Sequence, residues 1–175
     1  MTKPREIWVW VNKKGELMKI QLKLIVYGKN SFQKENFRPV VNSSWCKPKG
    51  GLWASPVDSE WGWKEWCLSE EFETTKLNNH FLLNYSGNTL KINCLEDTQQ
   101  MIWLEQSDYF YKAVPDFEQM RQEGIDAIWL TPQGENETRF NRDYSLYGWD
   151  CESVLVMNPD CLSVPALELN RNIEF

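Results

Sequence analysis

The chain is poor in metal-binding side chains. It has one histidine, His80, and its cysteines include no Cys-x-x-Cys pair. Structural zinc sites draw on clustered cysteine and histidine ligands, so we expect no zinc site and no other metal. The cysteines are also odd in number and widely spaced: Cys46, Cys67, Cys94, Cys151 and Cys161. This pattern predicts free thiols in a reducing compartment rather than a disulfide framework.

Long apolar runs and phosphate-binding glycine motifs are missing too. The apolar stretch near the N-terminus is interrupted by Asn12-Lys13-Lys14-Gly15, so it fits neither a secretory leader nor a membrane span. We therefore expect a cytoplasmic protein with no membrane partner. Gly50-Gly51 lacks the spacing of a dinucleotide or phosphate-loop fingerprint, and neither a Rossmann nor a P-loop motif is supported.

Positive charge is in deficit. Nineteen lysines and arginines face 25 acidic residues, for a formal net charge of -6 and a pI near 4.9. This balance argues against nonspecific attraction to nucleic acid or an anionic membrane, although a local basic patch can serve either. With 175 residues, 42% hydrophobic content and no internal repeat, we expect one domain over residues 1–175.

What the chain does contain is a series of short apolar segments separated by turn residues. We expect strands over 7–11, 17–27, 52–56, 81–85, 89–94 and 125–130. The fourth and fifth would form a hairpin around Ser86-Gly87-Asn88. Helices are predicted over 59–67, from Glu96, and from Pro115 to a C-terminal stop at Gly124. Residues 132–143 are expected to form a polar loop.

An acidic pair opens the last apolar run, Asp150-Cys151-Glu152 followed by Ser153-Val154-Leu155-Val156. Carboxylates are poor strand residues and costly to bury. Their placement therefore has two explanations: either the two acids face a cleft, or they lie in a solvated loop before the strand. Two residues apart, Asp150 and Glu152 share a face if the strand has already begun.

Five of the ten tryptophans lie between Trp45 and Trp66. Such a density suits a stacking platform for a sugar or a base. The spacing of Trp63 and Trp66 is typical of a helix that packs on a core, so these two are assigned to packing. Trp53, beside Ser55, is the remaining candidate for a ligand contact.

The order of these pieces resembles the ADP-ribosyltransferase fold, the NAD-cleaving domain of toxins and of bacterial or phage effectors. Tyr27-Gly28 at a strand end resembles the first family motif, 51–56 the second, with its serine, and 152–159 the third, in which a catalytic glutamate opens a strand. The resemblance covers residues 27–162. It implies an α+β fold, a split β-sandwich of two mainly antiparallel sheets with peripheral helices.

The resemblance also implies a reaction: ADP-ribose passes from NAD to a protein or nucleic-acid acceptor, no metal takes part, and a toxin of this kind has a neutralising antitoxin. Glu152 would stabilise the cationic ribose, Asp150 would engage the acceptor, and Ser55 would brace Glu152. The NAD-binding residues would be Tyr27, Gly28, Trp53, Ser55 and Tyr147.

The first motif departs from the family. Tyr27 stands where a histidine or arginine is expected, with Lys29 and Arg38 as nearby basic candidates. Such a departure also fits a catalytically inactive relative. Two alternatives therefore stay open: a non-catalytic module that binds a ligand through residues 45–66, and an NAD glycohydrolase that uses water. A nucleic-acid acceptor would meet Arg139 and Arg142 in the polar loop.

Overall fold

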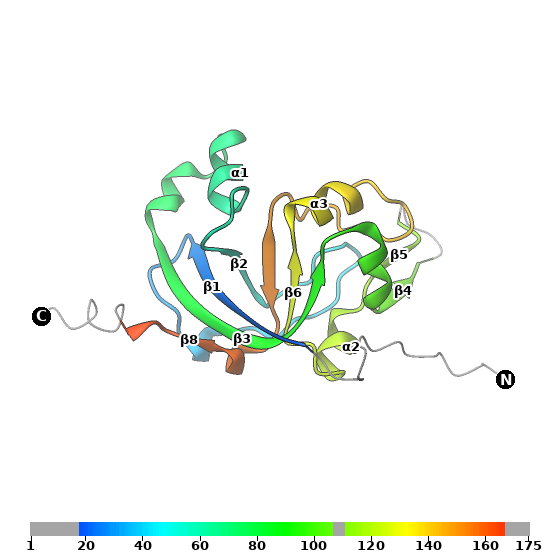
Figure 1. Cartoon of the computed structure of the whole chain (residues 1–175), viewed down its shortest axis with the longest axis horizontal. Helices are drawn as coiled ribbons and strands as arrows, with labels where there is room; N and C mark the ends of the chain where they lie inside the picture. Colours follow the sequence, from blue (N-terminus) through cyan, green and yellow to red (C-terminus); the bar gives the residue numbers. More distant parts are fainter. Residues whose placement is uncertain (1–17, 107–110, 167–175) are drawn as a thin grey trace, which may run out of the picture.

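The computed structural model describes residues 18–106 and 111–166, and the predicted strand over 7–11 lies outside them. One β-sheet dominates this part of the chain and closes on itself (Figure 1). Its neighbouring strands, in order around the barrel, are β1 (Lys19–Tyr27), β2 (Leu52–Pro56), β7 (Ser153–Val156), β6 (Ala127–Leu130) and β3 (His80–Ile92), which pairs with β1 again. All pairs are antiparallel except β3 with β6.

The closed barrel confirms the α+β class but corrects the predicted architecture. Two separate facing sheets were expected, and instead five strands form one closed sheet. Closure depends on β3, which pairs with β1 from His80 to Asn88 and then with β6 from Thr89 to Ile92. The short strand β8 (Leu162–Ser163) adds to β3, and β4 (Trp103–Glu105) pairs with β5 (Ala113–Pro115) in a small sheet of its own.

The predicted hairpin over 81–94 is wrong, because β3 runs through Ser86-Gly87-Asn88 without turning. Gly87 has no positive φ. A Cβ there would lie 2.7 Å from the Tyr85 hydroxyl and 2.9 Å from the Cβ of Asp126. The glycine therefore permits close packing of β3 against its neighbours rather than a chain reversal.

Three short α-helices surround the described barrel: α1 (Trp63–Ser69), α2 (Phe117–Gln122) and α3 (Pro132–Thr138). The prediction of α2 is confirmed, with Asp116 as its N-cap and Gly124 in the left-handed region after it. Residues 132–138 were predicted as loop, and this was wrong: Thr131 caps α3 and Pro132 occupies its first turn. The helix expected from Glu96 is the 3₁₀ helix η3 (Leu95–Gln100).

Alternation along the strands builds two apolar clusters, one on each face of the sheet. All five barrel strands contribute to the inner cluster, which includes Leu24, Leu83 and Val154. The outer cluster joins Leu155 and Trp149 to helix α2. Every residue of β7 is buried as a result. Within the described ranges, no helix combines the length and the apolar character that a membrane crossing needs.

Candidate functional site

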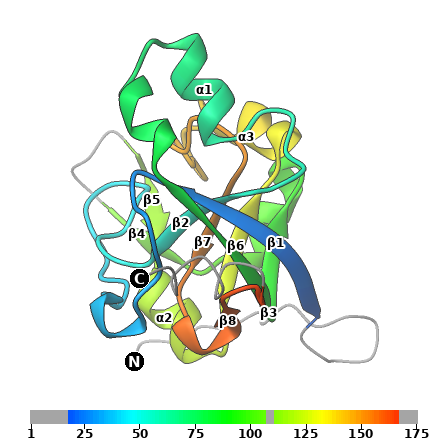
Figure 2. The ribbon, with the colours of Figure 1, turned by 90° about the vertical axis from the view of Figure 1, so that its left-hand side faces the viewer.

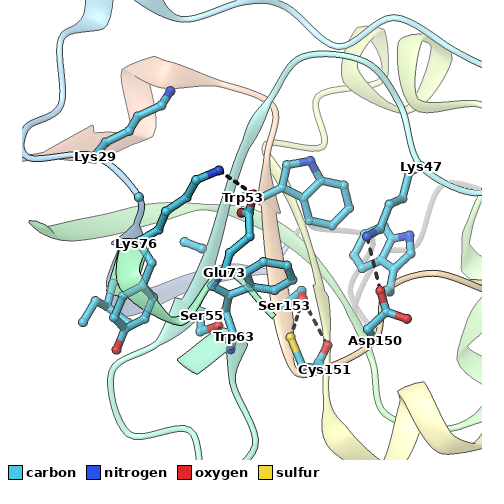
Figure 3. Close-up of a pocket in the computed structure, with 15 residues that line it drawn as sticks. Lys29, Lys47, Trp53, Ser55, Trp63, Glu73, Lys76, Asp150, Cys151 and Ser153 are labelled. Carbon is cyan, nitrogen blue, oxygen red and sulfur yellow. Dashed lines mark hydrogen bonds and ion pairs between the residues drawn. The ribbon is translucent and has the colours of Figure 1, made fainter. Parts of the chain in front are cut away.

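A pocket of about 440 Å³ lies where β1, β2 and the segment before β7 meet, with α1 and the 3₁₀ helix η2 (Thr74–Asn78) at its rim (Figure 3). β2 pairs with both β1 and β7, so segments distant in the sequence become neighbours. The lining residues are Ile25, Tyr27, Gly28, Lys29, Lys47, Trp53, Ala54, Ser55, Trp63, Glu73, Lys76, Trp149, Asp150, Cys151 and Ser153.

Five of the predicted site residues therefore share one pocket. Tyr27 and Gly28 stand at the end of β1, Trp53 and Ser55 belong to β2, and Asp150 precedes β7. Two predicted residues are not in the lining. They are Glu152 and Tyr147.

Glu152 is buried on the other side of the sheet from the pocket. Its Oε1 accepts a hydrogen bond of 2.8 Å from Nε1 of Trp129. Trp129 pairs with Val154 across β6 and β7, on the face opposite Ser153. The backbone N–H of Glu152 donates to the carbonyl of Trp61 at 2.9 Å. The side chain and the backbone of Glu152 are thus both held at the barrel end.

Asp150 does line the pocket. The carboxylate lies 3.4 Å from Nη2 of Arg139 and 3.7 Å from Nζ of Lys47. Because β7 begins only at Ser153, the acidic pair precedes the strand rather than opening it. Asp150 and Glu152 were expected to share a face only if the strand had already begun, and it has not. The Asp150 side chain lines the pocket, whereas the Glu152 side chain contacts Trp129.

Ser55 links three segments at the floor of the pocket. Its hydroxyl donates to the backbone carbonyl of Glu152 at 3.2 Å and accepts from the backbone N–H of Trp63 at 2.9 Å. The predicted contact with Glu152 thus exists through the backbone, not the carboxylate. Ser55 fixes β2, the start of β7 and α1 relative to one another.

Aromatic rings form much of the pocket wall. The rings of Trp53 and Trp149 meet edge to face, with centroids 4.6 Å apart. Trp149 is fully buried and donates from Nε1 to the carbonyl of Cys46. Trp149 therefore takes the place predicted for Tyr147, which is exposed and has its ring 6.2 Å from that of Phe140.

Trp63 was assigned to packing from its helical spacing. It does stack on Trp66, with ring centroids 5.0 Å apart, but it also lines the pocket. Spacing alone identifies a shared helix face and does not distinguish a core from a ligand pocket. The sequence signal that could have placed Trp63 in the pocket was its closeness in the chain to Trp53, which was already a candidate for a ligand contact.

Three lysines bring positive charge to the pocket. Lys29 and Lys76 lie on one side, while Lys47 faces Asp150 on the other (Figure 3). Lys76 pairs with Glu73, whereas Lys29 forms no ion pair within the described residues. Of the two basic candidates near the first motif, Lys29 is thus in this pocket. Arg38 is not in this pocket and lines a neighbouring hollow with Gly50 and Gly51, to which Lys29 also contributes.

Burial keeps two further lining groups protonated. Desolvation raises the pKa of Tyr27, with the negative charge of Glu65 as a second cause. Desolvation also raises the pKa of Cys151, from 9.0 to about 11. A thiol of this kind is protonated at neutral pH and is a poor nucleophile. Tyr27 remains a neutral phenol, able to donate and to accept hydrogen bonds.

The pocket thus combines aromatic walls with three lysines and two carboxylates, Glu73 and Asp150, which leaves an excess of positive charge. This lining suits an anionic ligand that carries flat rings. Across 18–106 and 111–166, no group of three or more histidine, cysteine or acidic side chains is arranged to hold a metal ion. No protein-family model, curated protein or solved structure matches the chain. The functional assignment therefore has to come from the pocket itself.

Proposed function

We propose that the protein is an NAD-dependent ADP-ribosyltransferase that transfers ADP-ribose to a macromolecular acceptor and releases nicotinamide. One observation carries the proposal: two segments that resemble motifs of this family supply Tyr27 and Ser55 to a single pocket, and Asp150, two residues before the third such segment, lines the same pocket. They lie at the adjacent strands β1, β2 and β7. The proposal does not rest on the two-sheet sandwich of that family, because five strands here form one closed sheet.

The lining matches the chemistry of NAD. The pyrophosphate of NAD carries two negative charges, which Lys29, Lys47 and Lys76 would offset. Trp53 and Trp63 provide ring faces for nicotinamide or adenine. The volume of about 440 Å³ falls in the range of ligand pockets.

The reaction breaks the bond between the ribose carbon and the nicotinamide nitrogen. The bonding electrons leave with nicotinamide, positive charge develops on the ribose, and an acceptor nucleophile then bonds to that carbon. A fixed carboxylate stabilises this charge. We assign the role to Asp150, which lines the pocket and is held by Lys47 and Arg139. Glu152, bonded to Trp129, becomes a positioning residue.

The test measures nicotinamide release from NAD, with cell-lysate proteins or RNA as acceptors. Asp150→Asn should lower turnover by about 100-fold, the scale of losing one preorganised electrostatic contact, while NAD affinity changes little. Glu152→Gln should keep most turnover, because a glutamine oxygen still accepts from Trp129. Glu105→Gln, an exposed acid on β4, is the matched control.

Each outcome of this test has a separate meaning. Loss in Glu152→Gln but not in Asp150→Asn would overturn the carboxylate assignment and keep the NAD pocket. Release without any acceptor would identify an NAD glycohydrolase. NAD binding with no release would identify a binding module, an alternative supported by Tyr27 in place of a basic residue and by the two cations beside Asp150. Neither binding nor release would reject the proposal.

A further inference from the structure

The connection between β2 and β3, residues 57–79, projects from the barrel (Figures 1 and 2). Three of its residues line the pocket. We refer to residues 57–79 as the acidic spur. It contains α1 and η2, and only Gly62 and Cys67 are buried in it. Residues 68–76 are exposed without interruption. The spur therefore presents most of its side chains to its surroundings rather than to the core.

Large apolar side chains are among those that the spur exposes. Leu68 is 54% exposed, Phe72 44% and Trp61 37%. Phe72 has its ring edge against Trp63 and Trp66, at centroid distances of 6.0 and 5.5 Å. Trp63 and Trp66 thus pack against one edge of the Phe72 ring, and much of the ring stays exposed to solvent. Grouped apolar exposure on a protein surface marks an interaction site.

The spur also accounts for most of the net negative charge of the chain. It has two lysines and six acids, a net charge of -4 out of -6 for the whole sequence. The acids are Asp58, Glu60, Glu65, Glu70, Glu71 and Glu73. Within the described residues, Glu70 and Glu71 form no ion pair, although both stand next to the apolar side chains. Their charge is free to meet a partner.

Backbone conformation in the spur is unusual on both sides of Phe72. Glu71 and Glu73 have φ values of 53° and 45°, in the left-handed region that non-glycine residues rarely adopt. Such conformations carry a free-energy cost and are concentrated at functional positions. Here they accompany the exposure of Phe72 between two acids.

We propose that the acidic spur is the docking surface for a basic protein segment, with apolar contacts to Leu68 and Phe72 and cationic side chains against Glu70 and Glu71. The charge of -4 selects a positively charged polypeptide and repels the phosphates of nucleic acid. This surface does not rest on the proposed function. Because Trp63, Glu73 and Lys76 of the spur line the pocket, the bound segment lies at its rim.

The test uses the full chain and a fluorescein-labelled lysine–leucine peptide of about 18 residues, amphipathic when helical. Fluorescence anisotropy should show binding that is about 10-fold tighter than for a scrambled peptide of the same composition and that weakens with added salt. Leu68→Ser with Phe72→Ser should weaken binding about 10-fold. Glu70→Gln with Glu71→Gln should weaken it and reduce its salt dependence.

Phe140→Ser is the matched control, since Phe140 is 79% exposed but lies beyond α3, outside the spur. Circular dichroism of each variant checks that the fold is retained. Equal affinity for the scrambled peptide, unchanged binding in both spur variants, or an equal loss in Phe140→Ser would overturn the proposal. Binding of fluorescein-labelled single-stranded DNA to the protein as tightly as the peptide would also overturn it. No arm requires NAD turnover, so this proposal and the proposed function fail separately.

Discussion

At the residue scale, the pocket depends on a few buried polar contacts that a sequence does not display. Ser55 was singled out because a family motif has a serine on that strand, and its hydroxyl does link β2, α1 and the start of β7. The direction of Glu152 was not predictable from spacing. It follows from Trp129, a residue 23 positions earlier whose indole N–H has the Glu152 carboxylate as partner.

Cys151 gives a prediction about pH. Burial raises its pKa from 9.0 to about 11, so the folded state holds the thiol proton more tightly than the unfolded state does. This contribution to stability is complete below pH 9 and is lost as the pH rises from 9 toward 11. In Cys151→Ser, the free energy of unfolding should fall less steeply over this interval, by up to about 1.4 kcal/mol per pH unit. Urea denaturation at several pH values measures it, and equal slopes would contradict it.

At the element scale, the helices and strands that could be predicted were those whose ends are determined by neighbouring residues in the sequence. Helix α2 has a capping aspartate and a terminal glycine, and both signals are readable in the sequence. The hairpin over 81–94 failed because Ser86-Gly87-Asn88 looks like a turn, whereas Gly87 serves contacts with Tyr85, Asp126 and Cys161. Asp126 is 39 residues away in the sequence, so the residues around Gly87 give no sign that a side chain there would collide with it.

Gly87→Ala tests this explanation of β3. The added Cβ would lie 2.9 Å from both the Asp126 Cβ and the Cys161 sulfur, so these neighbours must shift away from β3. We expect a loss of about 1–3 kcal/mol in the free energy of unfolding. Gly28→Ala is the comparison, because no atom lies within 4 Å of its Cβ and only its φ of +81° carries a cost. Urea denaturation measures both, and a stable Gly87→Ala variant would contradict the packing role.

At the scale of the whole molecule, barrel closure brings the predicted segments together and also explains the largest error. The resemblance placed Tyr27, Ser55 and Asp150 in one site, and the strand order β1-β2-β7 does so. Closure itself was not predictable, since it depends on one long strand that changes partners midway. Lys47 and Lys76 were missed for a similar reason: each reaches the pocket from a connection outside the recognised motifs.

The central claim is that this pocket binds NAD, and calorimetric titration of NAD into the purified protein tests it most directly. The account predicts saturable binding that Lys29→Ala weakens about 10-fold, because a cation that lines the pocket and would face the pyrophosphate is lost. Tyr147→Ala, an exposed aromatic outside the pocket, should leave the affinity unchanged. Absence of binding, or a loss in Tyr147→Ala equal to that in Lys29→Ala, would contradict it.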